Sequence, residues 1–245
     1  MRFVDSHLHL YDPDAESQVA LAVATRTLLV TCGEDRETST SAMRQAEKYM
    51  GTVKAFVGLH PSKALSAGSL AWLEQDLRQA SGMGEIGLDP KYSETGPGSA
   101  QMKALTTQLE LAQGARKPIQ VHSRDAEKEC LDALGGFNLG AVLMHWFQGE
   151  ELLQEVIQRG YYVSYGPSLL YSKKLQRMAL HSSHDRVLTE TDSPVPFGPL
   201  GGVRGPSLLP SVVFVLSELW GQGYEDTRET LKGNAMRFLG LPEKG

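Results

Sequence analysis

The sequence predicts a single (β/α)8 TIM barrel, in which a closed sheet of eight parallel strands is surrounded by helices. Eight short apolar runs, rich in Val, Ile and Leu, alternate with longer amphipathic runs along the 245 residues. Such runs are typical of strands buried on both faces, and their alternation with helical runs indicates a parallel sheet. Eight repeats in this length favour a closed barrel over a doubly wound open sheet, which normally has fewer strands.

The predicted strands are the apolar runs, taken in order. They span 3–7, 27–32, 53–60, 83–88, 117–122, 140–145, 161–166 and 186–191. The C-terminal ends of parallel barrel strands meet at one face of the barrel. Residues that end these runs are therefore expected to lie near one another, although they are far apart in the sequence.

The amphipathic runs between the strands predict the helices. They span 37–50, 69–80, 99–115, 125–134, 150–159, 172–181, 206–222 and 225–240. Ser and Thr residues near the start of the first of these, and Ser69 in the second, are suited to cap them. The crossover 11–26 has the weakest helical pattern, and the last helix is expected to pack across the barrel. The Gly- and Pro-rich stretch 193–207 directly follows the eighth strand, where barrel loops build the reactive face.

Composition and charge predict a cytoplasmic protein with one domain, residues 1–245. The net charge of −5 and the pI of about 5.8 give no general attraction to nucleic acid or to an anionic membrane. A nucleic-acid substrate would have to be drawn by local charge, such as bound cations. Cys32 and Cys130 are too few for a disulfide framework or a Cys-rich zinc site. No signal peptide and no apolar span of ~18–20 residues is recognisable, so no membrane association is expected.

Four imidazoles and two carboxylates stand at or near the ends of the apolar runs. They belong to His7, His9, Glu85, His122, His145 and Asp192. His7 and His9 are two residues apart on the first strand, so both side chains point to the same side. Glu85 lies in an apolar run without Lys or Arg, and a buried carboxylate needs a partner. A metal is at least as good a partner there as a helix dipole or an arginine.

Each of the remaining residues also has a structural explanation when it is taken alone. His122 and His145 end the fifth and sixth strands, where a His is often a hydrogen-bonded core or loop residue. Asp192 follows the eighth strand, and Asp-Ser-Pro makes a good turn. For all six residues these explanations would have to coincide at one face of one barrel. We therefore favour a metal site.

Ligand counting predicts two divalent ions. One set of ligands comprises His7, His9, Glu85 and Asp192. The other set comprises Glu85, His122 and His145. Glu85 can bridge the ions with its two oxygens, and Asp192 is also expected to accept a proton from water, which makes these two the predicted catalytic residues. The candidate ions are Zn, Mn, Mg, Fe and Ni; mixed nitrogen and oxygen ligation suits all but Mg, which prefers more oxygen.

Eight segments form an ordered set of motifs over almost the full chain. They are DSHLHL (5–10), VGLHP (57–61), GEIGLD (84–89), QLELA (108–112), PIQVHSRDA (118–126), MHWFQG (144–149), TETDSP (189–194) and GNAMRFLGL (233–241). In this order they resemble the TatD family of metal-dependent hydrolases, within the amidohydrolase-type barrels. The resemblance implies the same six metal ligands, with Glu85 in place of the carboxylated lysine used by many relatives in the wider superfamily. It also implies metal-dependent DNase activity, commonly 3′–5′ exonuclease activity on single strands.

Departures from the family pattern fall on loops that face the substrate. HWFQG replaces the family's H-C-F-S-G and introduces Trp146, which can stack a terminal base, although core packing is its commoner role. The loop 204–210 keeps Arg204 but lacks the Asn of the family's R-G-x-x-N-x-P. His60 and Arg204 are the candidate phosphate contacts. The alternatives are a turn residue before a proline for His60 and a solvated loop charge for Arg204.

The favoured hypothesis for function is hydrolysis of a phosphodiester by a metal-activated water, with a single-stranded DNA end as substrate. Two cations would supply local positive potential, which suits a short threaded strand end better than an extended duplex groove. The second hypothesis is carbonyl chemistry at the same site, by an amidase, lactonase or ester hydrolase, including a deacylase of aminoacyl-tRNA, because a fold does not name a substrate. The third is a non-enzymatic metal-binding module, disfavoured because Asp192 and the loop 193–207 leave positions open for substrate. No obligate protein partner is implied.

Overall fold

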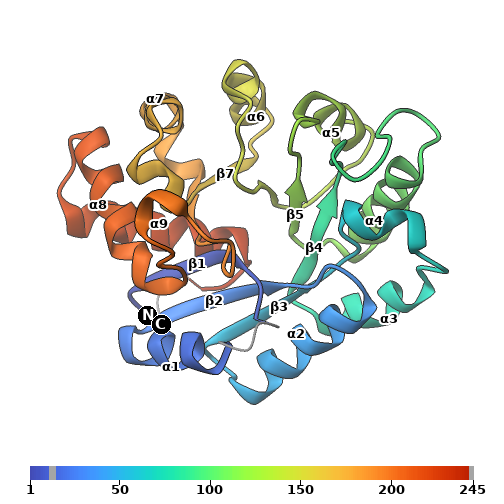
Figure 1. Cartoon of the computed structure of the whole chain (residues 1–245), viewed down its shortest axis with the longest axis horizontal. Coiled ribbons are helices and arrows are strands. Elements are labelled where there is room, and N and C mark those ends of the chain that lie inside the picture. The colour runs from blue at the N-terminus through green and yellow to red at the C-terminus, as the bar shows by residue number, and fades with distance from the viewer. Residues whose placement is uncertain (11–14, 243–245) are drawn as a thin grey trace.

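The computed structural model of the chain describes residues 1–10 and 15–242, and its strands form one eight-stranded sheet. The strands follow one another from β1 to β8, and each pair of neighbours is parallel. Helices lie around the outside of the strands (Figure 1). The predicted (β/α)8 barrel is therefore confirmed.

All eight predicted strands are present. They are β1 (Phe3–Leu8), β2 (Thr27–Cys32), β3 (Val53–Val57), β4 (Gly82–Gly87), β5 (Ile119–His122), β6 (Val142–Met144), β7 (Tyr162–Tyr165) and β8 (Val187–Thr189). The segment after β8 returns to β1 and brings the two ends of the sheet together. The backbone N–H of Asp192 donates to the carbonyl of His7 at 2.9 Å. The N–H of His9 donates to the carbonyl of Ser193 at 2.7 Å.

The predicted helices are also present, with ends that differ by a few residues. They are α2 (Arg36–Lys48), α3 (Ala71–Gln79), α4 (Ala100–Ala115), α5 (Glu127–Leu134), α6 (Leu153–Gln158), α7 (Lys173–His181), α8 (Leu209–Trp220) and α9 (Tyr224–Phe238). The first crossover, predicted at 11–26, contains α1 (Ala15–Thr25). Its first four residues, 11–14, lie outside the described residues.

The last helix, α9, packs across the end of the barrel where the strands begin. Phe238 stacks on Phe56 with ring centroids 6.1 Å apart and meets Tyr162 edge-on at 5.6 Å. Asn234 Nδ2 donates to the carbonyl of Val187, the first residue of β8, at 2.8 Å. Apolar packing thus fills this end, which leaves the opposite end of the barrel for polar side chains. In the part of the chain that is described, no helix has the length and apolar character needed to cross a membrane.

Two strands end two or more residues earlier than the apolar runs predict. β3 ends at Val57, and His60 caps a short 3-10 helix (Pro61–Ser66). The backbone N–H of His60 donates at 2.8 Å to the carbonyl of Glu34, so it leaves the β-ladder. β8 ends at Thr189, and Asp192 lies in the following loop, as predicted. The apolar pattern could not show these strand ends, because the residues that follow them are buried as well.

Candidate metal centre

The six predicted ligand side chains lie together at the C-terminal end of the barrel. They are His7 on β1, His9 just after β1, Glu85 on β4, His122 at the end of β5, His145 just after β6 and Asp192 after β8. Three overlapping groups of side chains have potential ligand atoms within 4.8 Å of one another. The groups are His7, Glu85 and His145; His7, His9 and Asp192; and His60, Glu85 and His122.

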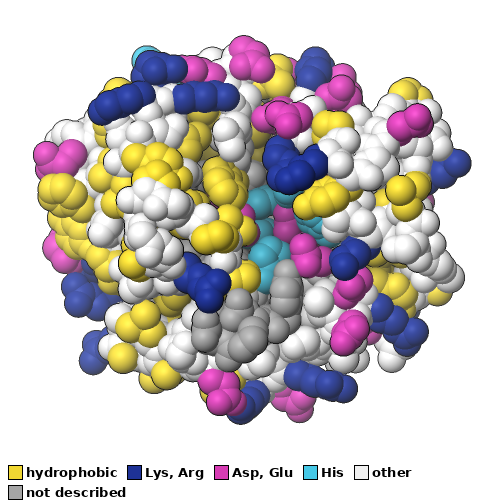
Figure 2. Space-filling model, in the orientation of Figure 1, with side chains coloured by type: hydrophobic (Ala, Val, Ile, Leu, Met, Phe, Trp, Pro, Cys, Tyr) yellow, Lys and Arg dark blue, Asp and Glu magenta, His cyan; other side chains and the backbone are white. Residues whose placement is uncertain are grey.

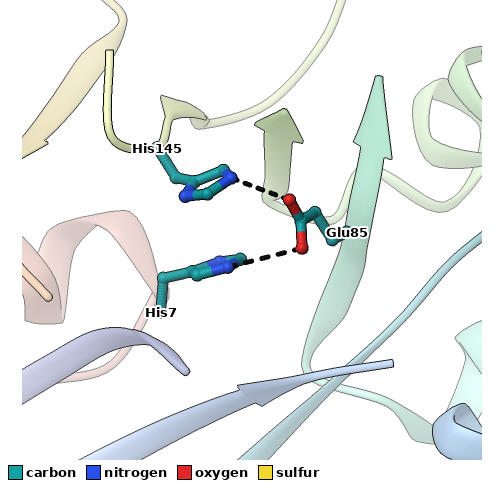
Figure 3. Close-up of side chains that lie close together, drawn as sticks. All are labelled: His7, Glu85 and His145. Carbon is teal, nitrogen blue, oxygen red and sulfur yellow. Dashed lines mark hydrogen bonds and ion pairs between the residues drawn. The ribbon is translucent and has the colours of Figure 1, made fainter. Parts of the chain in front are cut away.

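Glu85 is the centre of this arrangement, because its two carboxylate oxygens face different imidazoles. Oε1 lies 2.7 Å from Nδ1 of His122 and 2.8 Å from Nε2 of His145. Oε2 lies 3.5 Å from Nε2 of His7 and 3.3 Å from Nε2 of His9. Figure 3 shows the rings of His7 and His145 stacked, each facing one oxygen of Glu85. One carboxylate thus joins the two predicted ligand sets.

Local backbone geometry aims Glu85 into the barrel mouth. The register between β4 and β5 shifts between Met83 and Ile86, and such irregularities re-aim side chains beside functional sites. The neighbouring chain also approaches closely. A Cβ on Gly58 would lie 2.9 Å from the carbonyl oxygen of Glu85. Gly87, at φ +146, brings β4 so near β5 that a Cβ would meet the carbonyl oxygen of His122. The glycines that surround Glu85 are therefore required by packing.

Asp192 is held over the barrel by an unusual backbone conformation. Its φ of +48° lies in the left-handed region, which Asp and Asn tolerate better than most residues. Its Oδ1 lies 3.5 Å from Nε2 of His7 and 3.6 Å from Nε2 of His9. The loop after β8 therefore adds a second carboxylate to the pair of imidazoles from β1.

The other ring nitrogen of each imidazole also has a neighbour, and these neighbours differ between the two sets. In the set from β1, Nδ1 of His7 lies 2.5 Å from Oε1 of Gln120. Nδ1 of His9 donates to the carbonyl of Cys32 at 2.9 Å. Both acceptors are neutral. Such partners fix the ring orientation and the tautomer of a ligating histidine.

In the second set the outer neighbours are carboxyl groups. Nε2 of His122 lies 2.8 Å from Oδ2 of Asp89, and Nδ1 of His145 lies 3.7 Å from Oε2 of Glu190. Sequence reasoning missed Glu190 and Gln120. Their signal was a polar side chain inside an apolar strand run, the same signal that identified Glu85.

The electrostatics keep both central carboxylates ionised. Burial raises the pKa of Glu85, but the nearby imidazoles of His145 and His7 outweigh it and hold that pKa well below its ordinary value. Burial likewise raises the pKa of Asp192, and the nearby imidazole of His7 outweighs it, so the net shift is downward. Anionic oxygens surrounded by imidazoles are the donors that a divalent cation requires.

The donor set fits divalent cations better than it fits a hydrogen-bond network. Nε2 of His7 is buried and makes no hydrogen bond within the described residues. The separations of 3.3–3.6 Å between the β1 imidazoles and the carboxylates are long for hydrogen bonds. They match the spacing of about 3.4 Å expected between tetrahedral ligands with metal bonds of about 2.1 Å. This spacing supports a cation on the side of His7, His9 and Asp192.

His60 lies in the same cluster with a defined tautomer. Its Nδ1 accepts the backbone N–H of Ser62 at 3.1 Å, so the ring proton is on Nε2. That nitrogen lies 3.5 Å from Oε1 of Glu85. Burial lowers the pKa of His60 to about 4, so the ring is neutral at physiological pH. His60 therefore presents a neutral N–H donor to the site, and metal ligation through Nε2 would require that proton to be lost.

A cavity of about 670 Å³ opens beside the cluster, and His side chains are visible at its base in Figure 2. His60, Trp146 and Lys174 are among the residues that line it. Trp146, at φ +41°, also packs against Phe197 with ring centroids 5.6 Å apart. Arg204 is exposed, its Nη1 lies 3.4 Å from the carbonyl of Pro194, and it is not among the described residues that line the cavity. The structure thus places His60 in the lining of the cavity and Arg204 beside Pro194, which belongs to that lining.

We expect the metal-free protein to lose stability as the pH rises from about 6.5 to about 9. Burial lowers the pKa of His122, but the hydrogen bonds that its ring donates to Asp89 and Glu85 outweigh it and raise that pKa to about 9. A raised pKa in the folded state stabilises the fold below the unfolded value of about 6.5, and this stabilisation is lost as the pH passes the folded value. The melting temperature of chelator-treated protein should fall by roughly 5–10 °C over this window, measured by differential scanning fluorimetry.

A His122→Gln variant and metal-loaded protein are the controls for this pH dependence. The variant should show a shallower trend, because only the raised pKa values of His7 and His9 remain to contribute in the same direction. Saturation with a divalent cation should remove the trend, because ligating imidazoles are held neutral. A melting temperature that rises with pH in the chelated wild-type protein would contradict the assignment.

Comparison with known proteins shows which family the chain belongs to. The family model described as TatD related DNase matches residues 4–240. The chain belongs to the TatD family. The resemblance predicted from the motifs is thus confirmed over nearly the whole length.

Two curated TatD relatives cover almost all of this chain. The uncharacterized metal-dependent hydrolase YabD of Bacillus subtilis is 31% identical over 251 residues, which cover 96% of this chain and 98% of the relative. The deoxyribonuclease TATDN3 of Homo sapiens is 27% identical over 258 residues, which cover 96% of this chain and 94% of the relative. At the level that these relatives share, the protein is a metal-dependent hydrolase of the TatD family.

Solved structures agree on the fold. A TatD family hydrolase from Entamoeba histolytica superimposes with a TM-score of 0.81 and covers 97% of this chain and 98% of its own, at 17% identity. An uncharacterized amidohydrolase from Saccharomyces cerevisiae gives a TM-score of 0.76, with coverage of 97% and 99%, at 15% identity. These likenesses establish the barrel fold.

Proposed function

We propose that this protein is a metal-dependent deoxyribonuclease that removes nucleotides from the 3′ end of single-stranded DNA. The observation that carries the proposal is the convergence of four imidazoles and the two ionised carboxylates of Glu85 and Asp192 at the base of an open cavity. The human relative named deoxyribonuclease supports DNA as the substrate class.

Some residues of the site would bind cations, and others accept or donate protons. Glu85 would hold two divalent ions, one together with His7, His9 and Asp192, the other together with His122 and His145. Bound there, such ions supply Lewis acidity that activates water and offsets charge on a phosphate. Asp192 takes the proton that the attacking water loses, since its carboxylate is ionised and only one of its oxygens faces the β1 imidazoles. His60 donates its Nε2 proton in a hydrogen bond to a phosphate oxygen.

The charge of the cavity makes cations necessary for substrate binding as well as for chemistry. Within the described lining, five carboxylates face two basic side chains. The carboxylates are those of Glu34, Glu85, Asp125, Glu127 and Asp192, and the basic residues are Arg124 and Lys174. A cavity with this balance repels a phosphodiester. Two divalent cations reverse the sign of the net charge, so affinity for DNA depends on them.

The size of the cavity favours a strand end. A volume of about 670 Å³ is within the range of sites for small molecules, which is roughly 300–1,000 Å³. A cavity of this kind accepts one end of a flexible strand more readily than the side of a continuous duplex. This supports exonuclease action, with the terminal nucleotide in the cavity.

The test is digestion of a single-stranded oligonucleotide labelled at its 5′ end, with Mn²⁺, Mg²⁺ or Zn²⁺ added to metal-stripped protein. We expect stepwise shortening from the 3′ end, and no shortening and no oligonucleotide binding in the presence of a chelator. A 3′-phosphorothioate linkage should block the first step. Failure to cleave DNA with any of these metals, together with turnover of an acyl ester or an aminoacyl-tRNA, would replace the nuclease by a carbonyl hydrolase.

A further inference from the structure

Arg124 is a cationic side chain at the cavity that motif reasoning did not single out. It lies two residues after His122, in the loop between β5 and α5, and it lines the cavity. The next residue, Asp125, has a φ of +54° and turns the chain there. The Arg124 side chain is 39% exposed, so it is partly packed and partly open.

Two contacts hold the guanidinium of Arg124 in place. Its Nη2 forms an ion pair with Oδ2 of Asp89 at 2.5 Å, and its Cζ lies 5.4 Å from the ring centroid of Tyr92. Asp89 is fully buried and also accepts the backbone N–H of Lys91 at 2.9 Å. The side chain of Gln101 accepts the backbone N–H of Asp89 and donates to its carbonyl. The guanidinium is therefore held in place by a buried carboxylate at Nη2 and by an aromatic ring. Because it is already ordered, it loses less conformational entropy when it binds a ligand.

The same carboxylate oxygen connects Arg124 to the metal centre. Oδ2 of Asp89 lies 2.8 Å from Nε2 of His122, and Nδ1 of that ring faces Glu85. The guanidinium is thus separated from a predicted metal ligand by a single carboxylate. A guanidinium carries five donors in a planar fork, and Asp89 meets only one corner of it. Nε and Nη2 are buried, so Nη1 is the part of the fork that suits an oxyanion at the cavity.

We propose that Arg124 binds a non-bridging phosphate oxygen of the substrate and so fixes the scissile phosphodiester beside the cation-binding residues. The proposal rests on the proposed nuclease function. It replaces Arg204 as the arginine that contacts phosphate. The acidic lining of the cavity makes one fixed guanidinium near the reacting group valuable, because the other basic side chain, Lys174, lies on α7 and is exposed.

The test compares Arg124→Met and Arg124→Lys with the matched control Arg177→Met. Arg177 is an exposed arginine on α7, paired with Glu150 and not among the described residues that line the cavity. Three quantities are measured on metal-loaded protein: kcat and KM for the oligonucleotide, the Kd for inorganic phosphate by titration calorimetry, and metal content by mass spectrometry. The melting temperature of each variant checks that it is folded.

For Arg124→Met we expect kcat/KM to fall by about 10- to 100-fold, the loss typical for hydrogen bonds to a charged group. The Kd for inorganic phosphate should rise by a similar factor, while metal content stays at the wild-type value. Arg124→Lys should recover only part of the loss, because an ammonium lacks the fork. Arg177→Met should match the wild type. A purely structural role would instead lower metal content and melting temperature and leave the phosphate Kd of the folded fraction unchanged, which would overturn the proposal.

The outcomes separate this proposal from the nuclease function. If wild-type protein binds phosphate through Arg124 but cleaves no oligonucleotide, the anion site stands and the nuclease assignment fails. If wild-type protein and both Arg124 variants cleave the oligonucleotide with the same KM and kcat, the nuclease assignment stands and Arg124 is not a phosphate contact.

Discussion

Replacing Glu85 by Gln is expected to lower phosphodiester hydrolysis at least ~10³-fold and to reduce the number of divalent ions bound per chain. Glu85 faces imidazoles from β1, β5 and β6 with its two oxygens, so both predicted cation sets depend on it. Gln has nearly the same shape but no negative charge, and its amide presents one oxygen instead of two. Metal content by mass spectrometry and single-turnover digestion of a labelled oligonucleotide measure the two effects.

The matched control for Glu85 is Glu127→Gln. Glu127 also lines the cavity and is partly buried, but it belongs to none of the described groups that could hold a metal. Its variant should retain metal and stay close to wild-type activity. Wild-type metal content in Glu85→Gln, with unchanged hydrolysis, would sink the idea of a bridging carboxylate. Equal losses of hydrolysis in both variants would indicate that activity depends only on the negative charge of the cavity.

Replacing Asp192 by Asn is expected to lower kcat by about 10²- to 10⁴-fold, with a smaller change in KM. The carboxylate would accept the proton from water, and an amide at neutral pH accepts none. Metal content should fall by one ion at most, because Asp192 faces only the imidazoles of His7 and His9. Asn tolerates the left-handed conformation at this position, so the fold should be retained.

Asp125→Asn provides the control for this substitution. Asp125 is also a left-handed aspartate that lines the cavity, but it is exposed and outside the described imidazole cluster. The variant should therefore behave like the wild type in kcat. The pH profile gives a second readout, because loss of the proton acceptor should remove the acidic limb of the kcat profile. An Asp192→Asn protein with wild-type kcat and an unchanged acidic limb would rule out this role for Asp192.

The prediction from sequence worked best where local pattern carries the information. Runs of Val, Ile and Leu identified all eight strands, and helical spacing identified α2 to α9. Strand ends were less accurate, as at β3, which ends at Val57, because the apolar character continues into the buried loop. His60 lies in the cluster, but its neutral state arises from burial and the proton on Nε2 from a turn, and neither can be read from the sequence.

Individual pairings of side chains that are distant in the sequence lay beyond sequence reasoning. The Arg124–Asp89 pair and the placement of Glu190 beside His145 depend on how the strands align around the barrel. Arg204 illustrates the same limit, since its loop resembles a family motif but the sequence could not show that its Nη1 meets the carbonyl of Pro194.

By itself, the sequence determined the barrel and the six side chains that meet at its mouth. It could do so because strand periodicity and the shared polarity of parallel strands place the ends of the runs at one face. The tertiary structure decided how those side chains are used: which oxygen of Glu85 meets which ring, which imidazoles have carboxyl neighbours, and which arginine reaches the cavity. These features depend on ladder irregularities and loop paths, which set the positions of side-chain atoms and leave no periodic trace in the sequence.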